Sequence, residues 1–103
     1  MIYKLMFHPD ALEEWGNLSA GDRTYFKNKL KQCLANPHVP GSRLSGDHNL
    51  YKIKRKRPPL RLTYHANDKE FVVTALSVGK RDSDVYIEMI KRYESSAITD
   101  SPR

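Results

Sequence analysis

Basic side chains gather in one short segment of the sequence, residues 51–61. The segment reads YKIKRKRPPLR and holds six basic residues and no acidic one. Because side chains alternate between the two faces of a strand, Lys52 and Lys54 would share one face, with apolar neighbours on the other. A return strand that begins at Leu60 would add Arg61 to the lysine face. Cations fixed on a sheet in this way could bind a polyanion or stabilise the charge of a phosphate under attack.

The overall composition also favours an acidic partner. The chain has 103 residues, a formal net charge of +6 and a sequence pI of about 9.6. This length is enough for one domain with a modest core, and the charge favours nucleic acid, an anionic membrane or an acidic protein. No apolar run approaches the roughly 18 residues that suggest a membrane span, and the first residues lack the apolar segment of a signal peptide. We therefore expect a cytoplasmic protein that does not enter the membrane.

Cysteine and histidine give no sign of a metal site. Cys33 is the only cysteine, so it cannot form an internal disulfide. The spacing of Cys33 and the four histidines resembles no zinc site. We expect neither a metal nor another cofactor.

The rest of the chain predicts the elements that position the basic segment. Hydrophobic spacing and turn residues predict strands at 2–7, 49–56, 60–66 and 71–78, and helices at 9–15, 22–35 and 83–93. The order β-α-α-β-β-β-α predicts an α+β fold: a small antiparallel sheet, two N-terminal helices packed on one face, and a C-terminal helix. We expect a domain at residues 1–94 and a disordered tail at 95–103.

Several motifs in this order resemble the RelE-type toxins of bacterial toxin–antitoxin pairs, which belong to the wider RelE/ParE superfamily. They are ALEEW at 11–15, LSG at 44–46, YKIK at 51–54, RLTY at 61–64, SVGKR at 77–81, VY at 85–86 and KR at 91–92. Each motif alone is weak, but their combination and order are specific. The resemblance covers residues 2–94 and implies a RelE-like fold.

The resemblance implies the toxin component of a type II toxin–antitoxin system. Such a toxin is a metal-independent endoribonuclease, or mRNA interferase, that enters the A site of the 70S ribosome, cleaves the mRNA there and stops translation. In this chemistry the ribose 2′-hydroxyl attacks the adjacent phosphorus, a cyclic phosphate forms and a 5′-hydroxyl leaves. The implied partners are the ribosome with its 16S rRNA, the A-site mRNA and a RelB-like antitoxin.

The resemblance also implies a catalytic set: Lys52, Lys54, Arg61, Arg81 and Tyr86. Neighbouring cations favour the neutral form of an amine, so Lys54, in the densest cluster, is the candidate base with Lys52 assisting. Which of the two lysines takes the proton stays open. The planar fork of Arg61 suits two phosphate oxygens, and Arg81 would stabilise the leaving oxygen. Tyr86 could stack on a base.

A second set of basic residues would hold RNA without taking part in the chemistry. It consists of Arg43, Arg55, Lys56, Arg57 and Lys80. Family relatives often carry a basic residue where Ser45 stands, and Arg43 could compensate for it.

Other interpretations of the fold and of the single residues remain open. A ParE-like protein on the same fold would inhibit DNA gyrase, although such relatives generally lack the Lys/Arg/Tyr set. A non-catalytic basic module would only neutralise phosphates of nucleic acid. His65 shares the predicted face of Arg61 and would be an easier base than lysine, but the resemblance does not single it out. His8, His38 and His48 fall in turns or loops, and Tyr86 could simply pack.

Overall fold

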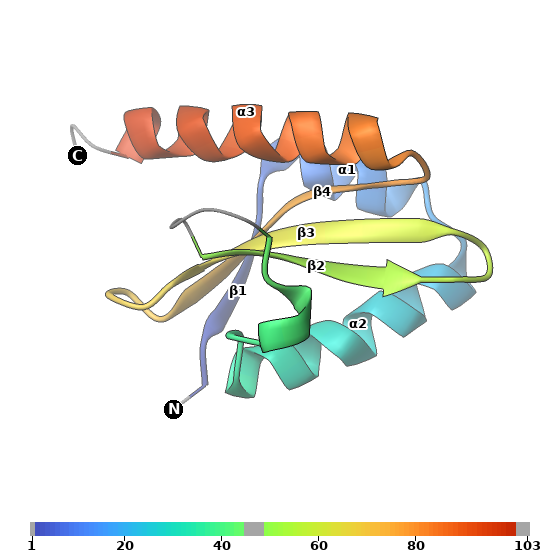
Figure 1. The fold of residues 1–103 in the computed structure, drawn as a ribbon, viewed down its shortest axis with the longest axis horizontal. Helices are drawn as coiled ribbons and strands as arrows, with labels where there is room; N and C mark the ends of the chain where they lie inside the picture. The colour runs from blue at the N-terminus through green and yellow to red at the C-terminus, as the bar shows by residue number, and fades with distance from the viewer. Residues whose placement is uncertain (1, 45–48, 101–103) are drawn as a thin grey trace.

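A four-stranded sheet lies between helices on its two faces (Figure 1). The computed structural model describes residues 2–44 and 49–100. Its elements are β1 (Lys4–Phe7), α1 (Pro9–Gly16), α2 (Ala20–Ala35), the 3₁₀ turn η1 (Pro40–Ser42), β2 (Leu50–Arg55), β3 (Leu60–Asn67), β4 (Val72–Gly79) and α3 (Asp82–Asp100). This order confirms the predicted succession of strands and helices.

The sheet has the strand order β1-β4-β3-β2. Strands β2, β3 and β4 are antiparallel, as predicted, but β1 pairs parallel with β4, with Phe7 opposite Ala75. The prediction of a wholly antiparallel sheet is therefore wrong for β1, and the sheet is mixed. Short turns fix the directions of consecutive strands, whereas β1 and β4 are far apart in the chain and no turn relates them.

Helices α1 and α2 begin with side-chain caps. His8 Nδ1 accepts a hydrogen bond from the Asp10 amide at 3.1 Å, and Pro9 occupies the first turn. Ser19 Oγ accepts from the Asp22 amide at 3.1 Å. Such caps satisfy amides that have no partner inside the helix. The serine cap also explains why α2 begins at Ala20 rather than at residue 22.

The main core lies between α2 and the sheet. Phe26, Leu30 and Cys33 of α2 are buried against apolar residues of the sheet, including Tyr51 and Ile53. Trp15 and Leu18 pack against the same cluster. The two N-terminal helices thus cover one face, as predicted, and Tyr51 and Ile53 of β2 point toward them.

Helix α3 packs on the opposite face through a smaller cluster. Leu50, Leu76 and Met89 are buried there, and Tyr93 packs against them. The register of β3 and β4 shifts between Thr63 and Tyr64, so that Leu76 has no partner on β3. This bulge directs both Leu76 and the next residue toward α3.

The end of α3 departs from the prediction. The helix continues to Asp100, whereas the sequence analysis ended it at residue 93 and made residues 95–100 part of a disordered tail. The chain contains no glycine or proline from Lys80 to Ser101, so nothing in the sequence forces an earlier end. Along the part of the chain that the structure describes, no helix is both long and apolar enough to cross a membrane.

Candidate active site

Strand register places the predicted cations in two neighbouring rows across the sheet. Lys54 of β2 lies opposite Arg61 of β3, which lies opposite Gly79 of β4. In the next row, Lys52 lies opposite Thr63. Neighbouring strands are about 4.8 Å apart, so the three charged side chains start from backbone positions close together on the α3 face. Lys54 is exposed, while Lys52 and Arg61 are partly buried.

The end of β4 brings Arg81 to the same rows. Arg61 Nη1 lies 3.5 Å from the Lys80 carbonyl oxygen, and Arg81 follows with its side chain exposed. A Cβ on Gly79 would lie only 3.2 Å from Cγ2 of Val85, so glycine lets the first turn of α3 approach the strand closely. The structure therefore gathers four of the five predicted catalytic residues at one end of the sheet.

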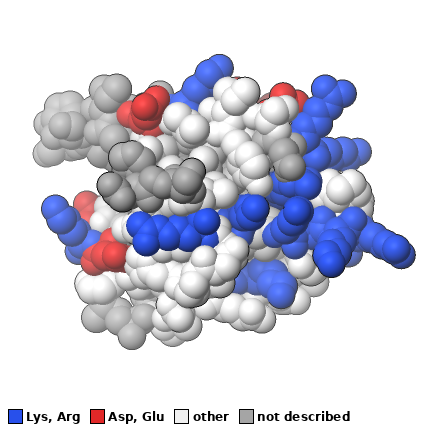
Figure 2. Space-filling view, viewed as in Figure 1, with Lys and Arg blue, Asp and Glu red and all other residues white. Residues whose placement is uncertain are grey.

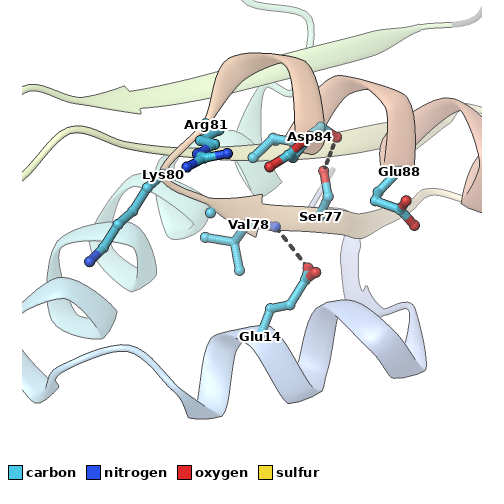
Figure 3. A pocket seen from close by; sticks show the side chains of 9 residues that line it. Glu14, Ser77, Val78, Lys80, Arg81, Asp84 and Glu88 are labelled. Atoms are coloured by element: carbon cyan, nitrogen blue, oxygen red, sulfur yellow. Dashed lines mark hydrogen bonds between the residues drawn. The ribbon is translucent and has the colours of Figure 1, made fainter.

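Tyr86, the fifth, lies beside this group rather than within it. Its partly buried ring lines a cavity of about 430 Å³ whose other walls include Leu44, Leu50, Met89 and Ile90. Arg81 lines a different cavity, of about 330 Å³, at the β4–α3 junction (Figure 3). An apolar cavity edged by an aromatic ring could hold a nucleobase.

The predicted RNA-binding residues differ in their surroundings. Lys56, Arg57, Lys80 and Arg43 are exposed, and Figure 2 shows lysine and arginine gathered over the end of the molecule where β2 meets β3. Arg55 instead pairs with Asp22 at 3.0 Å, and its guanidinium lies 4.7 Å from the centre of the Tyr25 ring. It fastens the hairpin to α2, a role that the sequence analysis did not predict.

The LSG motif at 44–46 is only partly described by the structure. Ser45 and Gly46 of the LSG motif, and His48, lie outside the described residues. Arg43 and Leu44 are described, and the Leu44 amide donates to the Leu50 carbonyl at 2.8 Å. The segment before the hairpin therefore runs alongside β2.

The described histidines contact groups outside the two rows of cations. His65 shares the α3 face with Arg61, as predicted, but lies four residues farther along β3 and packs against the Tyr93 ring at 4.8 Å. His38 Nε2 lies 2.7 Å from Asp68 Oδ1, and its other ring nitrogen contacts the Tyr51 hydroxyl. His8 caps α1. No described histidine lies in the row of Lys54 and Arg61.

A partly buried ion pair that the sequence did not predict lies next to the site. Arg92 of α3 donates from Nη1 and Nη2 to the two carboxylate oxygens of Glu14 in α1, at 2.8 and 3.0 Å. Arg92 is 8% exposed, and an unpaired charge at such a position would cost several kcal/mol. The hydrogen-bonded Glu14 carboxylate raises the pKa of the Arg92 guanidinium. The partners are 78 residues apart in sequence, so no local pattern could reveal them.

Two buried hydroxyls were missed as well. Thr63 Oγ1 and Ser77 Oγ lie 2.6 Å apart, and Ser77 Oγ donates to the Val85 carbonyl at 2.8 Å. Because the single hydroxyl hydrogen of Ser77 goes to Val85, the hydrogen between the two hydroxyls comes from Thr63. These bonds fix the first turn of α3 to the central strands. The sequence could not predict their burial, because strand alternation predicts the face on which a side chain lies but not whether a helix covers that face.

Comparison with known proteins identifies the family. No protein-family model matches the chain. The chain is 41% identical over 93 residues to the mRNA interferase toxin RelE of Escherichia coli K12, covering 89% of this chain and 98% of the relative. The mRNA interferase RelE of Shigella flexneri matches to the same extent.

Solved structures agree with the sequence matches. A mutant of E. coli toxin RelE in the free state has a TM-score of 0.83 and 39% identity, over 89% of this chain and 98% of the other. The match to the intact E. coli RelBE toxin–antitoxin complex has a TM-score of 0.74 and 38% identity, over 78% and 98% of the two chains. With this identity over nearly the full length, and with the rows of cations on the same fold, the chain belongs to the RelE-type toxins.

Proposed function

We propose that this protein is the toxin of a type II toxin–antitoxin pair and a ribosome-dependent endoribonuclease that cleaves mRNA in the A site. The observation that carries the proposal is the pair of cationic rows formed by Lys52, Lys54 and Arg61, with Arg81 at their end. Relatives that bear the name mRNA interferase are 41% identical to the chain. Its place of action would be the cytoplasm, where ribosomes translate.

Each side chain in the two rows has a role that fits transphosphorylation. A lysine amine, on Lys52 or Lys54, takes the proton of the 2′-hydroxyl as its oxygen attacks phosphorus. Arg61 donates to the non-bridging oxygens, whose negative charge grows in the transition state. Arg81 stabilises the 5′-oxygen as its bond to phosphorus breaks, and that oxygen takes a proton from water. The products are a 2′,3′-cyclic phosphate and a 5′-hydroxyl end.

Tyr86 would act on the nucleotide rather than on the phosphate. Its ring stands at the edge of an apolar cavity next to the cationic rows. Stacking on a base that has left the helical stack contributes about 1–3 kcal/mol and helps to hold the RNA for in-line attack. This role needs no proton transfer from the tyrosine.

The exposed cations outside the rows would bind rRNA. Arg43, Lys56, Arg57 and Lys80 are exposed around the site, and contacts to phosphates supply affinity without sequence preference. Arg55 would contribute less, because Asp22 already pairs with it.

A RelB-like antitoxin would silence the toxin. A solved structure of the related E. coli toxin contains RelB. An acidic segment that folds on binding would be complementary to the basic surface in Figure 2.

Alanine variants test the catalytic assignment. We expect Lys54→Ala, Arg61→Ala and Arg81→Ala each to lower single-turnover cleavage of ribosome-bound mRNA by roughly 100-fold or more, and to relieve growth arrest. Lys69→Ala, which removes an exposed lysine from the β3–β4 turn, is the matched control and should cleave normally. Unaltered cleavage in all three variants, with folding verified by circular dichroism, would overturn the assignment.

A further inference from the structure

The outer edge of β4 changes partner halfway along the strand. β1 pairs with Val72 to Ala75, and the next amide, that of His8, donates to the Ala75 carbonyl at 2.9 Å. Beyond Ala75, no strand among the described residues pairs with this edge. An unpaired, buried strand edge leaves amides and carbonyls without partners and is unfavourable.

The Glu14–Arg92 ion pair takes the place of the missing strand. Arg92 Nη1 donates to the Leu76 carbonyl at 2.8 Å, and Glu14 Oε1 accepts from the Val78 amide at 3.1 Å. The same two side chains bind each other through both carboxylate oxygens. The paired side chains of α1 and α3 therefore bind the open edge of β4 at one carbonyl and one amide.

The backbone groups that the pair binds, at Leu76 and Val78, lie shortly before Arg81 in the chain. Val78 precedes Gly79, and Lys80 and Arg81 follow it; Figure 3 shows Glu14 beneath this junction, bonded to the Val78 amide. On the far side of the junction, Arg61 approaches the Lys80 carbonyl. The strand end is thus held from its outer edge and from the face of the sheet.

Arg81 itself depends on this backbone. Its side chain is exposed and makes no hydrogen bond or ion pair with the groups described in the structure. Since no hydrogen bond or ion pair to a described residue fixes the side chain, the position of Arg81 follows from where β4 ends and α3 begins. A shift of this junction would move Arg81 relative to Arg61.

We propose that Glu14 and Arg92 are positioning residues that hold the β4–α3 junction so that Arg81 meets the leaving oxygen. They touch neither RNA nor the reacting atoms and act through Arg81. This inference rests on the proposed function, because it concerns the rate of the cleavage assigned to Arg81.

The test compares Glu14→Gln in two backgrounds. Glutamine keeps the shape and can still accept from the Val78 amide, but it removes the carboxylate that holds Arg92 most closely. The longer ion pairs of Arg92 with Glu88 at 3.5 Å and Asp10 at 4.0 Å remain. We expect Glu14→Gln to lower the single-turnover rate on ribosome-bound mRNA by about 10- to 100-fold, since small misplacements of catalytic groups have effects of this size. Ribosome affinity should change less than about twofold, because the basic surface is intact.

The second background separates positioning from general weakening of the fold. If Glu14 acts through Arg81, then Glu14→Gln added to Arg81→Ala should slow the residual cleavage by less than about twofold. An equal loss in both backgrounds, or no loss in the wild-type background, would overturn the inference. Glu13→Gln, an exposed neighbour on the same helix with the same change in charge, is the matched control and should leave the rate unchanged.

A further variant keeps the test decisive if Glu14→Gln does not fold. Glu14→Asp preserves the charge but withdraws the carboxylate by one methylene, and it should show the same dependence on Arg81. Circular dichroism and thermal melts verify the fold of each variant. Failure of the proposed function would look different, because the wild-type protein would then not cleave ribosome-bound mRNA at all.

Discussion

Among single residues, Arg61 best separates phosphate binding from catalysis. It lies between Lys54 and Gly79 in one row of the sheet, next to the backbone that leads to Arg81. A guanidinium can donate to two oxygens of one phosphate in a fixed plane, whereas an ammonium acts as a point charge. Charge alone would serve binding, but the transition state needs the geometry as well.

Arg61→Lys should therefore impair cleavage more than binding. We expect the single-turnover rate on ribosome-bound mRNA to fall by about tenfold or more, with ribosome affinity within about twofold of wild type. Arg57→Lys, an equal change at an exposed hairpin residue, should affect neither quantity. Parallel losses of rate and affinity for Arg61→Lys would indicate that Arg61 only binds.

At the scale of the elements, a polar network joins the residue before β1, the segment before η1 and the β3–β4 turn. The Tyr3 hydroxyl donates to Asp68 Oδ1 at 2.7 Å, and His38 Nε2 lies 2.7 Å from the same oxygen. The hydrogen bonds from Tyr3 and then from His38 hold the pKa of Asp68 below its ordinary value of 3.8. Ionised Asp68 therefore stabilises the folded state at pH values above 3.8, and this stabilisation disappears as the pH falls through the lower folded value.

Asp68→Asn tests this linkage. The variant should unfold at lower urea concentration than wild type at pH 7, and the gap between the two midpoints should narrow as the pH falls below about 4. Equilibrium urea unfolding at several pH values measures it. Glu70→Gln, which removes an exposed carboxylate of the same turn, should show no such narrowing. A gap that stays constant with pH would contradict the proposed linkage.

The elements that the sequence predicted well are those set by local signals. Proline, glycine and Asx residues mark most boundaries, and alternation along β2 predicted that Lys52 and Lys54 face away from Tyr51. The parallel pairing of β1, the bulge at Leu76 and the continuation of α3 past Tyr93 were not predicted. Each of these depends on tertiary packing or on the absence of a stop signal.

The candidate site, too, has residues that local sequence patterns predicted and residues that they did not. The family motifs and strand parity predicted the cationic rows by residue. No role was predicted for Glu14, Arg92, Thr63 or Ser77, although all four lie within those motifs. A partly buried ion pair between α1 and α3 leaves no periodic trace in the sequence, because its members meet only in the folded chain. The prediction for Tyr86 is a third case: its helix was predicted, but its place beside a separate cavity was not.

For the molecule as a whole, the net charge of +6 and the exposed cations near the hairpin favour binding to a polyanion. Exposed cations that contact phosphates release counterions, and each contact steepens the dependence of affinity on salt. The chemistry, by contrast, depends on the geometry of the two rows. Binding and cleavage should therefore respond to different substitutions.

The double variant Lys56→Gln/Arg57→Gln should separate ribosome binding from cleavage. We expect weaker ribosome binding and a shallower slope of log affinity against log salt concentration, with the single-turnover rate at saturating ribosomes unchanged. Filter binding at a series of salt concentrations provides the slope. The same slope as wild type would place the rRNA contact elsewhere on the surface.

The most direct test of ribosome-dependent cleavage is primer-extension mapping of a defined mRNA incubated with the protein, with and without programmed ribosomes. The proposed function predicts cuts inside the A-site codon only when ribosomes are present, and their loss in Arg81→Ala. No cuts from folded wild-type protein in either condition would contradict the proposed activity, and equal cuts in naked RNA would contradict its dependence on the ribosome.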